Sequence, residues 1–241
     1  MHEYTNHLGQ PIGFPVPHWK PAPYPPHEPI EGRFCVLEPL DVAKHAESLY
    51  SANSLDPEGA MWTYMPVGPF ANKDAYFQWA LEASQSRDPL FFAIIDKELG
   101  RAVGVASYLR IDPKQGTIEV GHLAFSPLLQ KTPAATEAMY LMMERAFSLG
   151  YRRYEWKCNA LNAPSRRAAQ RFGFSFEGVF RQAIIVKGHN RDTAWYSVID
   201  AEWLPLQSAF LQWLDPTNFD AEGRQRIRLS EMTAPLLKQK W

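Results

Sequence analysis

The segment from Lys131 to Thr136 has the residue types of a helix start that binds an anion. Thr132 can cap the helix, because its hydroxyl accepts from an exposed backbone N–H, and Pro133 suits the first helical position, where a donor has no partner. Three small residues follow, and we expect their N–H groups to be free at the positive end of the helix: Ala134, Ala135 and Thr136. Together with the charge of Lys131, this predicts a phosphate site; the alternative is an ordinary helix beginning with Thr-Pro.

The elements around this segment predict a strand, a crossover helix and a second strand. Thr117 to Phe125 reads as an extended run, Pro133 to Leu149 has an apolar stripe at helical spacing with Gly150 to end it, and Arg153 to Cys158 reads as a strand. A strand, helix and strand in this order join parallel strands. We therefore expect one parallel junction, between the strands that flank the Thr132 helix.

The strand from Thr117 to Phe125 changes its apolar pattern partway along. Ile118 and Val120 occupy even positions, whereas Leu123 and Phe125 occupy odd ones. One extra residue moves every later side chain to the opposite face, and glycine tolerates the dihedral angles that this needs. The pattern predicts a β-bulge at Gly121.

The remaining patterns complete a single α/β domain. They predict a strand at Arg33–Leu37, a helix capped by Asp41, a helix at Asn72–Ser86, a hairpin of Leu90–Asp96 and Ala102–Ile111, a short helix at Asn162–Phe172, a strand pair of Phe176–Val186 and Thr193–Ile199, and a helix at Glu202–Leu214. The order predicts a mixed, mostly antiparallel sheet flanked by helices.

Both ends of the chain differ from this domain in pattern. Eight prolines lie between Met1 and Pro29, which favours an extended arm over residues 1–31. Trp19 and Tyr24 can dock this arm on its own domain or on a second subunit, so a homodimer remains open. We expect the domain at 32–214 and a C-terminal tail at 215–241.

The composition excludes several classes of protein. Hydrophobic residues make up 46% and charged residues 21% of 241 residues, as in globular proteins, and a net charge of −1 argues against nucleic acid as a partner. Two cysteines without metal or redox spacing, and no apolar run long enough for a signal or a membrane span, predict a cytoplasmic protein that does not bind membranes.

Residues Gln130 to Ala135 (QKTPAA) resemble the acetyl-CoA signature of the GNAT superfamily, Q/R-x-x-G-x-G/A, with Pro133 at the first glycine position. Other motifs resemble the branch that contains the ribosomal-protein N-terminal acetyltransferases: Asn162 to Ser165, Gly173-Phe174, Phe176 to Gly178 and Arg191 to Thr193. The resemblance covers about residues 32–214. It implies a GNAT-like sheet whose central parallel strands splay apart.

The resemblance also implies an acetyl-CoA-dependent N-acetyltransferase that needs no metal. Its amine acceptor, a small molecule, an amino acid or a peptide N-terminus, would attack the thioester directly. The implied cofactor contacts are Leu123, Ala124, Phe125, Gln130, Lys131, Thr132, Ala134, Ala135, Thr136, Asn162 and Arg166.

Glu119 is the implied general base and Ser165 the implied general acid. A solvated or salt-bridged glutamate is the alternative for Glu119, and His122 is a second candidate base. For Ser165 the alternative is a bond to helix backbone. Many relatives carry a tyrosine where this chain has Ala169.

Acceptor choice is expected to depend on the loop between the first two helices and on the turn from Lys187 to Arg191. Four side chains would form an apolar mouth, unless they serve the core: Trp62, Tyr64, Met65 and Phe70. A rival function is a non-catalytic acyl-CoA-binding or sensing module, favoured by Pro133 and the missing tyrosine. A scaffold whose arm joins subunits is a third.

Overall fold

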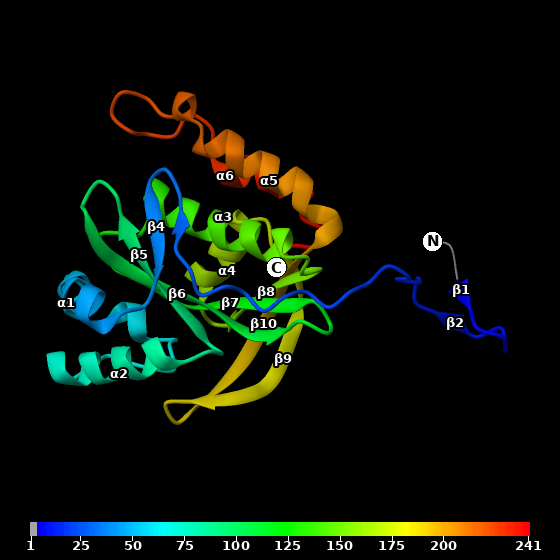
Figure 1. Ribbon diagram of the computed structural model, residues 1–241, viewed down its shortest axis with the longest axis horizontal. Helices are drawn as coiled ribbons and strands as arrows, with labels where there is room; N and C mark the ends of the chain where they lie inside the picture. The colour runs from blue at the N-terminus through cyan, green and yellow to red at the C-terminus, as the bar shows by residue number, and fades with distance from the viewer. Residues whose placement is uncertain (1–3) are drawn as a thin grey trace.

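An eight-stranded sheet forms the frame of the computed structural model, which describes residues 4–241 (Figure 1). In spatial order its strands are β3 (Ile30–Glu31), β4 (Cys35–Pro39), β5 (Leu90–Asp96), β6 (Arg101–Asp112), β7 (Thr117–Phe125), β8 (Arg153–Asn159), β10 (His189–Ile199) and β9 (Ser175–Val186). Every neighbouring pair is antiparallel except β7 and β8. The predicted mixed, mostly antiparallel sheet and its parallel junction are confirmed. Residues 1–3 of the predicted arm lie outside the described range.

Helices cover both faces of this sheet (Figure 1). One face carries α1 (Val42–Asn53), α2 (Lys73–Gln85) and the short η1 (Ala60–Trp62); the other carries α3 (Pro133–Ser148), α4 (Ala163–Arg171), α5 (Asp200–Leu214) and α6 (Leu229–Thr233). Alternate residues of the strands pack into two separate cores. Phe91 and Ala93 face the α1 and α2 side, whereas Phe92 and Ile94 face α3. Within residues 4–241, no helix combines the length and apolarity needed to cross a membrane.

The β7–β8 pair comes apart halfway along. Pairing runs from Thr117 opposite Arg153 to Val120 opposite Trp156, and in the described part of the chain it ends there, although both strands continue. The sheet therefore opens on the carboxyl side of Val120.

A bulge in β7 accompanies this opening, one residue later than the sequence predicts. Gly121 pairs with Ser107 and Ala124 with Val105, so the extra residue lies at His122 and Leu123. His122, with φ of 50°, adopts the left-handed conformation. The prediction of a bulge at Gly121 is therefore wrong by one position, because Gly121 still belongs to the β6 ladder.

A buried carboxylate fixes α3 to the beginning of β4. Glu137 accepts hydrogen bonds from the backbone N–H groups of Arg33, Phe34 and Cys35, at 2.8, 2.6 and 2.9 Å. The N–H groups of Arg33 and Phe34, which precede β4, are thereby withdrawn from sheet pairing, and the strand predicted at Arg33–Leu37 is observed at Cys35–Pro39.

The two terminal segments pack on this same domain. In the arm, the Trp19 Nε1 donates to the carbonyl of Lys114 at 3.0 Å, and the Pro23 carbonyl accepts from Tyr151 at 3.1 Å. The arm before Trp19, with β1 (Tyr4–Thr5) and β2 (Pro11–Ile12), extends away from the body (Figure 1). In the tail, which also holds η2 (Pro216–Asn218) and η3 (Ala234–Leu236), Leu229 is fully buried.

Glu137→Ala should lower the free energy of unfolding by about 3 kcal/mol or more, because each buried donor left without an acceptor costs about 1 to 3 kcal/mol. Urea denaturation followed by circular dichroism measures the change. Glu82→Ala, at an exposed position of α2, is the control and should stay within about 0.5 kcal/mol of the parent protein. Equal losses for the two variants would contradict the anchoring role.

Candidate functional site

A cleft of about 1520 Å³ occupies the opening between β7 and β8. Its walls come from β7 and β8, the first turns of α3 and α4, the η1 loop, the β9–β10 hairpin and tail residues between Phe219 and Arg228. These segments lie far apart in the sequence. The cleft is large enough for a ligand of cofactor size together with a second molecule.

The start of α3 forms one end of the cleft, with Gln130, Lys131, Thr132, Ala135 and Thr136 on its wall. Thr132 is the N-cap, as predicted, and its Oγ1 accepts from the N–H of Ala135 at 3.1 Å. The N–H of Thr136 donates to the Thr132 carbonyl at 3.4 Å. The expectation of three free amides is therefore wrong for Ala135 and Thr136, because the cap that starts the helix uses those donors itself.

Three arginines at this end were not predicted from the sequence: Arg171, Arg224 and Arg228. Arg171 donates from Nη1 to the Oγ1 of Thr136 at 3.1 Å, and burial lowers its pKa. Its guanidinium lies 5.2 Å from the ring centroid of Trp213. No carboxylate in the described range pairs with it, so it is available to an anion.

Other predicted contacts divide into those on the cleft wall and those away from it. Leu123, Phe125 and Asn162 line the cleft, whereas Ala124 and Ala134 are buried in the core. The side chain of Gln130 donates to the Phe125 carbonyl at 2.8 Å, and so braces the loop before α3. Arg166 lies against Trp241, 4.0 Å from its ring centroid, and is not part of the wall.

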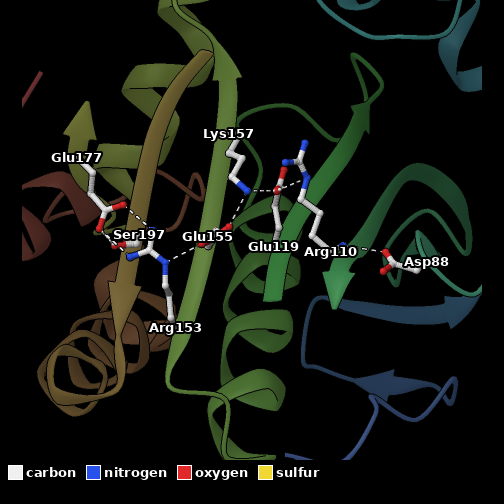
Figure 2. A network of polar contacts seen from close by, with 8 residues as sticks. All are labelled: Asp88, Arg110, Glu119, Arg153, Glu155, Lys157, Glu177 and Ser197. Carbon is white, nitrogen blue, oxygen red and sulfur yellow. Dashed lines mark hydrogen bonds and ion pairs between the residues drawn. The ribbon is translucent and has the colours of Figure 1, made fainter. Parts of the chain in front are cut away.

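Glu119 lies on the wall at the point where β7 and β8 separate (Figure 2). Its side chain is 6% exposed, and its Oε2 lies 2.9 Å from the Nζ of Lys157 and 3.2 Å from the Nε of Arg110. Burial raises the pKa of Glu119, against the opposing effect of Lys157 and Arg110. The structure shows the salt-bridged glutamate that the sequence left as an alternative, and this carboxylate also lines the cleft; its role as a base stays a prediction.

A row of charges continues from Glu119 across the sheet (Figure 2). Lys157, whose side chain is 3% exposed, also contacts Glu155 at 2.7 Å, and Glu155 contacts Arg153 at 2.6 Å. Arg153 in turn pairs with Glu177. These contacts form a chain of three cations and three carboxylates, which we call the charged row: Arg110, Glu119, Lys157, Glu155, Arg153 and Glu177.

Ser165, at the start of α4, lines the same cleft as Glu119. Its backbone N–H is capped by Asn162, and its Oγ accepts from the Trp156 indole at 3.1 Å. The bond from Trp156 does not use the hydroxyl hydrogen, which can be donated to another acceptor; the Cys158 thiol is a neighbour of this hydroxyl. His122, the second candidate base, also lines the cleft and contacts the Ser107 hydroxyl at 2.9 Å; burial lowers its pKa.

Two of the four residues that were predicted to form an apolar mouth line the cleft. Tyr64 and Met65 line the cleft, whereas Trp62 and Phe70 pack edge to face, with centroids 5.3 Å apart, in the core beneath α1 and α2. The carbonyl of Trp62 nevertheless accepts from the Nζ of Lys187 at 2.8 Å. This bond joins the η1 loop to the tip of the β9–β10 hairpin. Within residues 4–241 no three His, Cys, Asp or Glu side chains are grouped to hold a metal ion.

Comparison with known proteins connects this geometry to one family. Residues 35–175 match the family model described as an acetyltransferase (GNAT) domain. The uncharacterised N-acetyltransferase p20 of Bacillus licheniformis is 28% identical over 152 residues, which are 61% of this chain and 84% of that protein.

Solved structures agree with this match. A GCN5-related N-acetyltransferase from Brucella melitensis has 48% identity and a TM-score of 0.89 over 91% of this chain and all of that chain. A GNAT-family protein from Chromobacterium violaceum has 39% identity and a TM-score of 0.74, over 80% of this chain and 96% of that one. The ribosomal-protein acetyltransferase RimL, at 20% identity and a TM-score of 0.62 over 71% and 94% of the two chains, shares the fold.

Because Arg171 is the partly buried cation at the α3 end, Arg171→Met should weaken the binding of coenzyme A about 10- to 100-fold, the range of one lost charge-assisted hydrogen bond. Isothermal titration calorimetry gives the affinities. Arg167→Met, on the exposed side of the same helix, is the matched control and should bind like the parent. If both variants bind coenzyme A equally well, Arg171 does not contact the ligand.

Proposed function

The chain belongs to the GNAT acetyltransferase family, and on that premise we propose that it transfers an acetyl group from acetyl-CoA to a primary amine of a small molecule, an amino acid or a peptide N-terminus. One observation carries the proposal: a single cleft joins the cationic α3 end to the buried carboxylate of Glu119 at the strand opening. The two buried, unpaired cysteines suit a reducing cytoplasm.

The residues of the α3 end suit the phosphates of coenzyme A. Arg171 and Lys131 supply positive charge beside the helix start, and Arg228 adds a more exposed charge from the tail. Beyond Val120 the β7 backbone has no β8 partner in the described chain, so its free edge can bond an extended ligand arm as an added strand would. When bound, acetyl-CoA supplies the activated acetyl thioester.

Glu119 is placed to receive the proton that the attacking amine must lose. Burial strengthens its affinity for a proton, and the contacts with Lys157 and Arg110 hold the carboxylate in place. As the new carbon–nitrogen bond forms, the carbon–sulfur bond breaks. The Ser165 hydroxyl, held by Trp156, can donate to the departing sulfur.

A non-catalytic acyl-CoA-binding or sensing module is the second candidate. The observation in its favour is that Glu119 already contacts two cations, which lowers the tendency of its carboxylate to accept a proton. The tyrosine of many relatives is replaced by Ala169, which is fully buried.

Glu119→Gln separates the two candidates, because an amide cannot accept the amine proton. We expect turnover to fall about 10²- to 10⁴-fold with the affinity for coenzyme A unchanged. The assay is the release of free thiol from acetyl-CoA over a panel of amines, with the exposed Glu98→Gln as control. No turnover of any amine by the parent protein would exclude the enzyme and leave the sensor.

The acidic limb of the pH profile should report the same group. Glu119 must be ionised to act, and its pKa is raised, so kcat/KM should fall on acidification at a pH above 4.5, the ordinary value for glutamate. Lys157 lowers the pKa of Glu119, so Lys157→Met should move the limb to higher pH. A limb that stays in place, or moves to lower pH, would assign the base to another residue.

A further inference from the structure

The acceptor side of the cleft is a chamber between the η1 loop and the β9–β10 hairpin, closed at one point by the bond from Lys187 to the Trp62 carbonyl. We call this region the acceptor chamber. Its wall is mainly apolar and includes Met61, Tyr64, Met65, Ile184 and Val186. Arg191 is the charged residue that the hairpin adds to this wall.

The guanidinium of Arg191 makes no ion pair with any of the residues that the structure describes. It lies on β10 opposite Ile184, beside an irregularity in the β9–β10 register. Its Nε is shielded from solvent and makes no hydrogen bond, and within residues 4–241 no carboxylate lies in ion-pair contact with it. Arg191 as a whole is half-buried, and shielding part of its guanidinium from water without a hydrogen bond is costly, so a ligand that supplies acceptors gains from binding there.

The neighbouring charges do not neutralise Arg191. The charged row contains three carboxylates and three cations in mutual contact, so its members balance one another (Figure 2). Asp56 and Glu119 are the acidic residues among those described that line the cleft. Asp56 is occupied by its own turn, since its Oδ2 accepts from the N–H of Met61 at 2.8 Å. Among the described residues, Arg191 is therefore left without a carboxylate in ion-pair contact in the chamber.

We propose that Arg191 binds an oxyanion, a carboxylate or a phosphate, carried by the same acceptor molecule whose amine faces Glu119. This rests on the proposed function and narrows its acceptor class. A guanidinium presents parallel N–H groups that match two oxygens of either anion, and the apolar wall suits the rest of a small acceptor. Glu119 and Arg191 line the same cleft, so the two ends of one acceptor molecule would lie in one chamber. A polyamine, cationic at both ends, is disfavoured by Arg191.

Matched acceptors test this in the full-length protein. L-phenylalanine is compared with L-phenylalaninamide, and O-phosphoethanolamine with ethanolamine, by thiol release from acetyl-CoA. We expect kcat/KM to favour the anionic member of at least one pair about 10- to 100-fold, through KM. A preference within the phenylalanine pair would identify the anion bound by Arg191 as a carboxylate, and a preference within the ethanolamine pair would identify it as a phosphate. The proposal would be overturned if, in both pairs, the compound without the oxyanion had an equal or higher kcat/KM.

Variants assign the preference to Arg191. Arg191→Met should abolish the discrimination between the members of a pair, while Arg191→Lys, which keeps the charge, should retain part of it. Arg181→Met, exposed on β9 and away from the cleft, is the matched control and should behave like the parent. Melting temperatures check that each variant is folded. A preference that survives Arg191→Met would also overturn the proposal.

Binding separates this proposal from the proposed function. Calorimetry of the complex with coenzyme A should show N-acetylphenylalanine binding more tightly than its amide, and the difference should vanish in Arg191→Met. If no amine is acetylated but this difference is present, the catalytic proposal fails while Arg191 remains an anion site. If acetylation occurs without any anion preference in rate or binding, the role of Arg191 fails while the enzyme stands.

Discussion

The end of β7–β8 pairing at Val120 and Trp156 is the constraint on which the site depends. The two strands follow different neighbours beyond that point. β7 shifts its register against β6 by one residue at His122 and Leu123, whereas β8 keeps an unbroken register with β10 as far as Asn159. The opening lies at the carboxyl end of β7, where the chain turns into α3. A helix that begins there must present its positive end to the opening, as crossover helices do beside parallel strands.

Side chains along a β-strand point alternately to its two faces, and this alternation gathers the charged residues of β8 on one face. Arg153, Glu155 and Lys157 alternate along β8 with Tyr154, Trp156 and Cys158, so the charged side chains share one face while the others enter the core. Glu119 stands opposite Glu155 in the parallel register, which would be repulsive without Lys157 between them. The ammonium of Lys157 also lies 3.7 Å from the Trp195 ring centroid. Its buried charge is thus satisfied from three sides.

Local signals in the sequence predict the elements well, and long-range contacts explain what they miss. The predicted caps at Asp41 and Thr132 form in the structure, because a carboxylate or hydroxyl oxygen needs only a donor in the next turn of the helix. The exact bulge residue depends on the β6 ladder, and the beginning of β4 depends on Glu137, about 100 residues away. Arg228 reaches the cleft from the tail, for which no periodic pattern exists, and Arg171 reaches it from the end of α4, where its carbonyl accepts from Thr233 of the tail.

Glu137 has an electrostatic consequence for the end of the cleft at which α3 begins. A carboxylate in the second turn of α3 would weaken the positive potential of the helix start, close to where phosphates are expected. Its two oxygens are instead surrounded by the peptide dipoles of residues 33–35, which offset the negative field locally. Glu137 thus anchors α3 to the chain before β4, and its charge does not cancel the attraction between the helix start and an incoming anion.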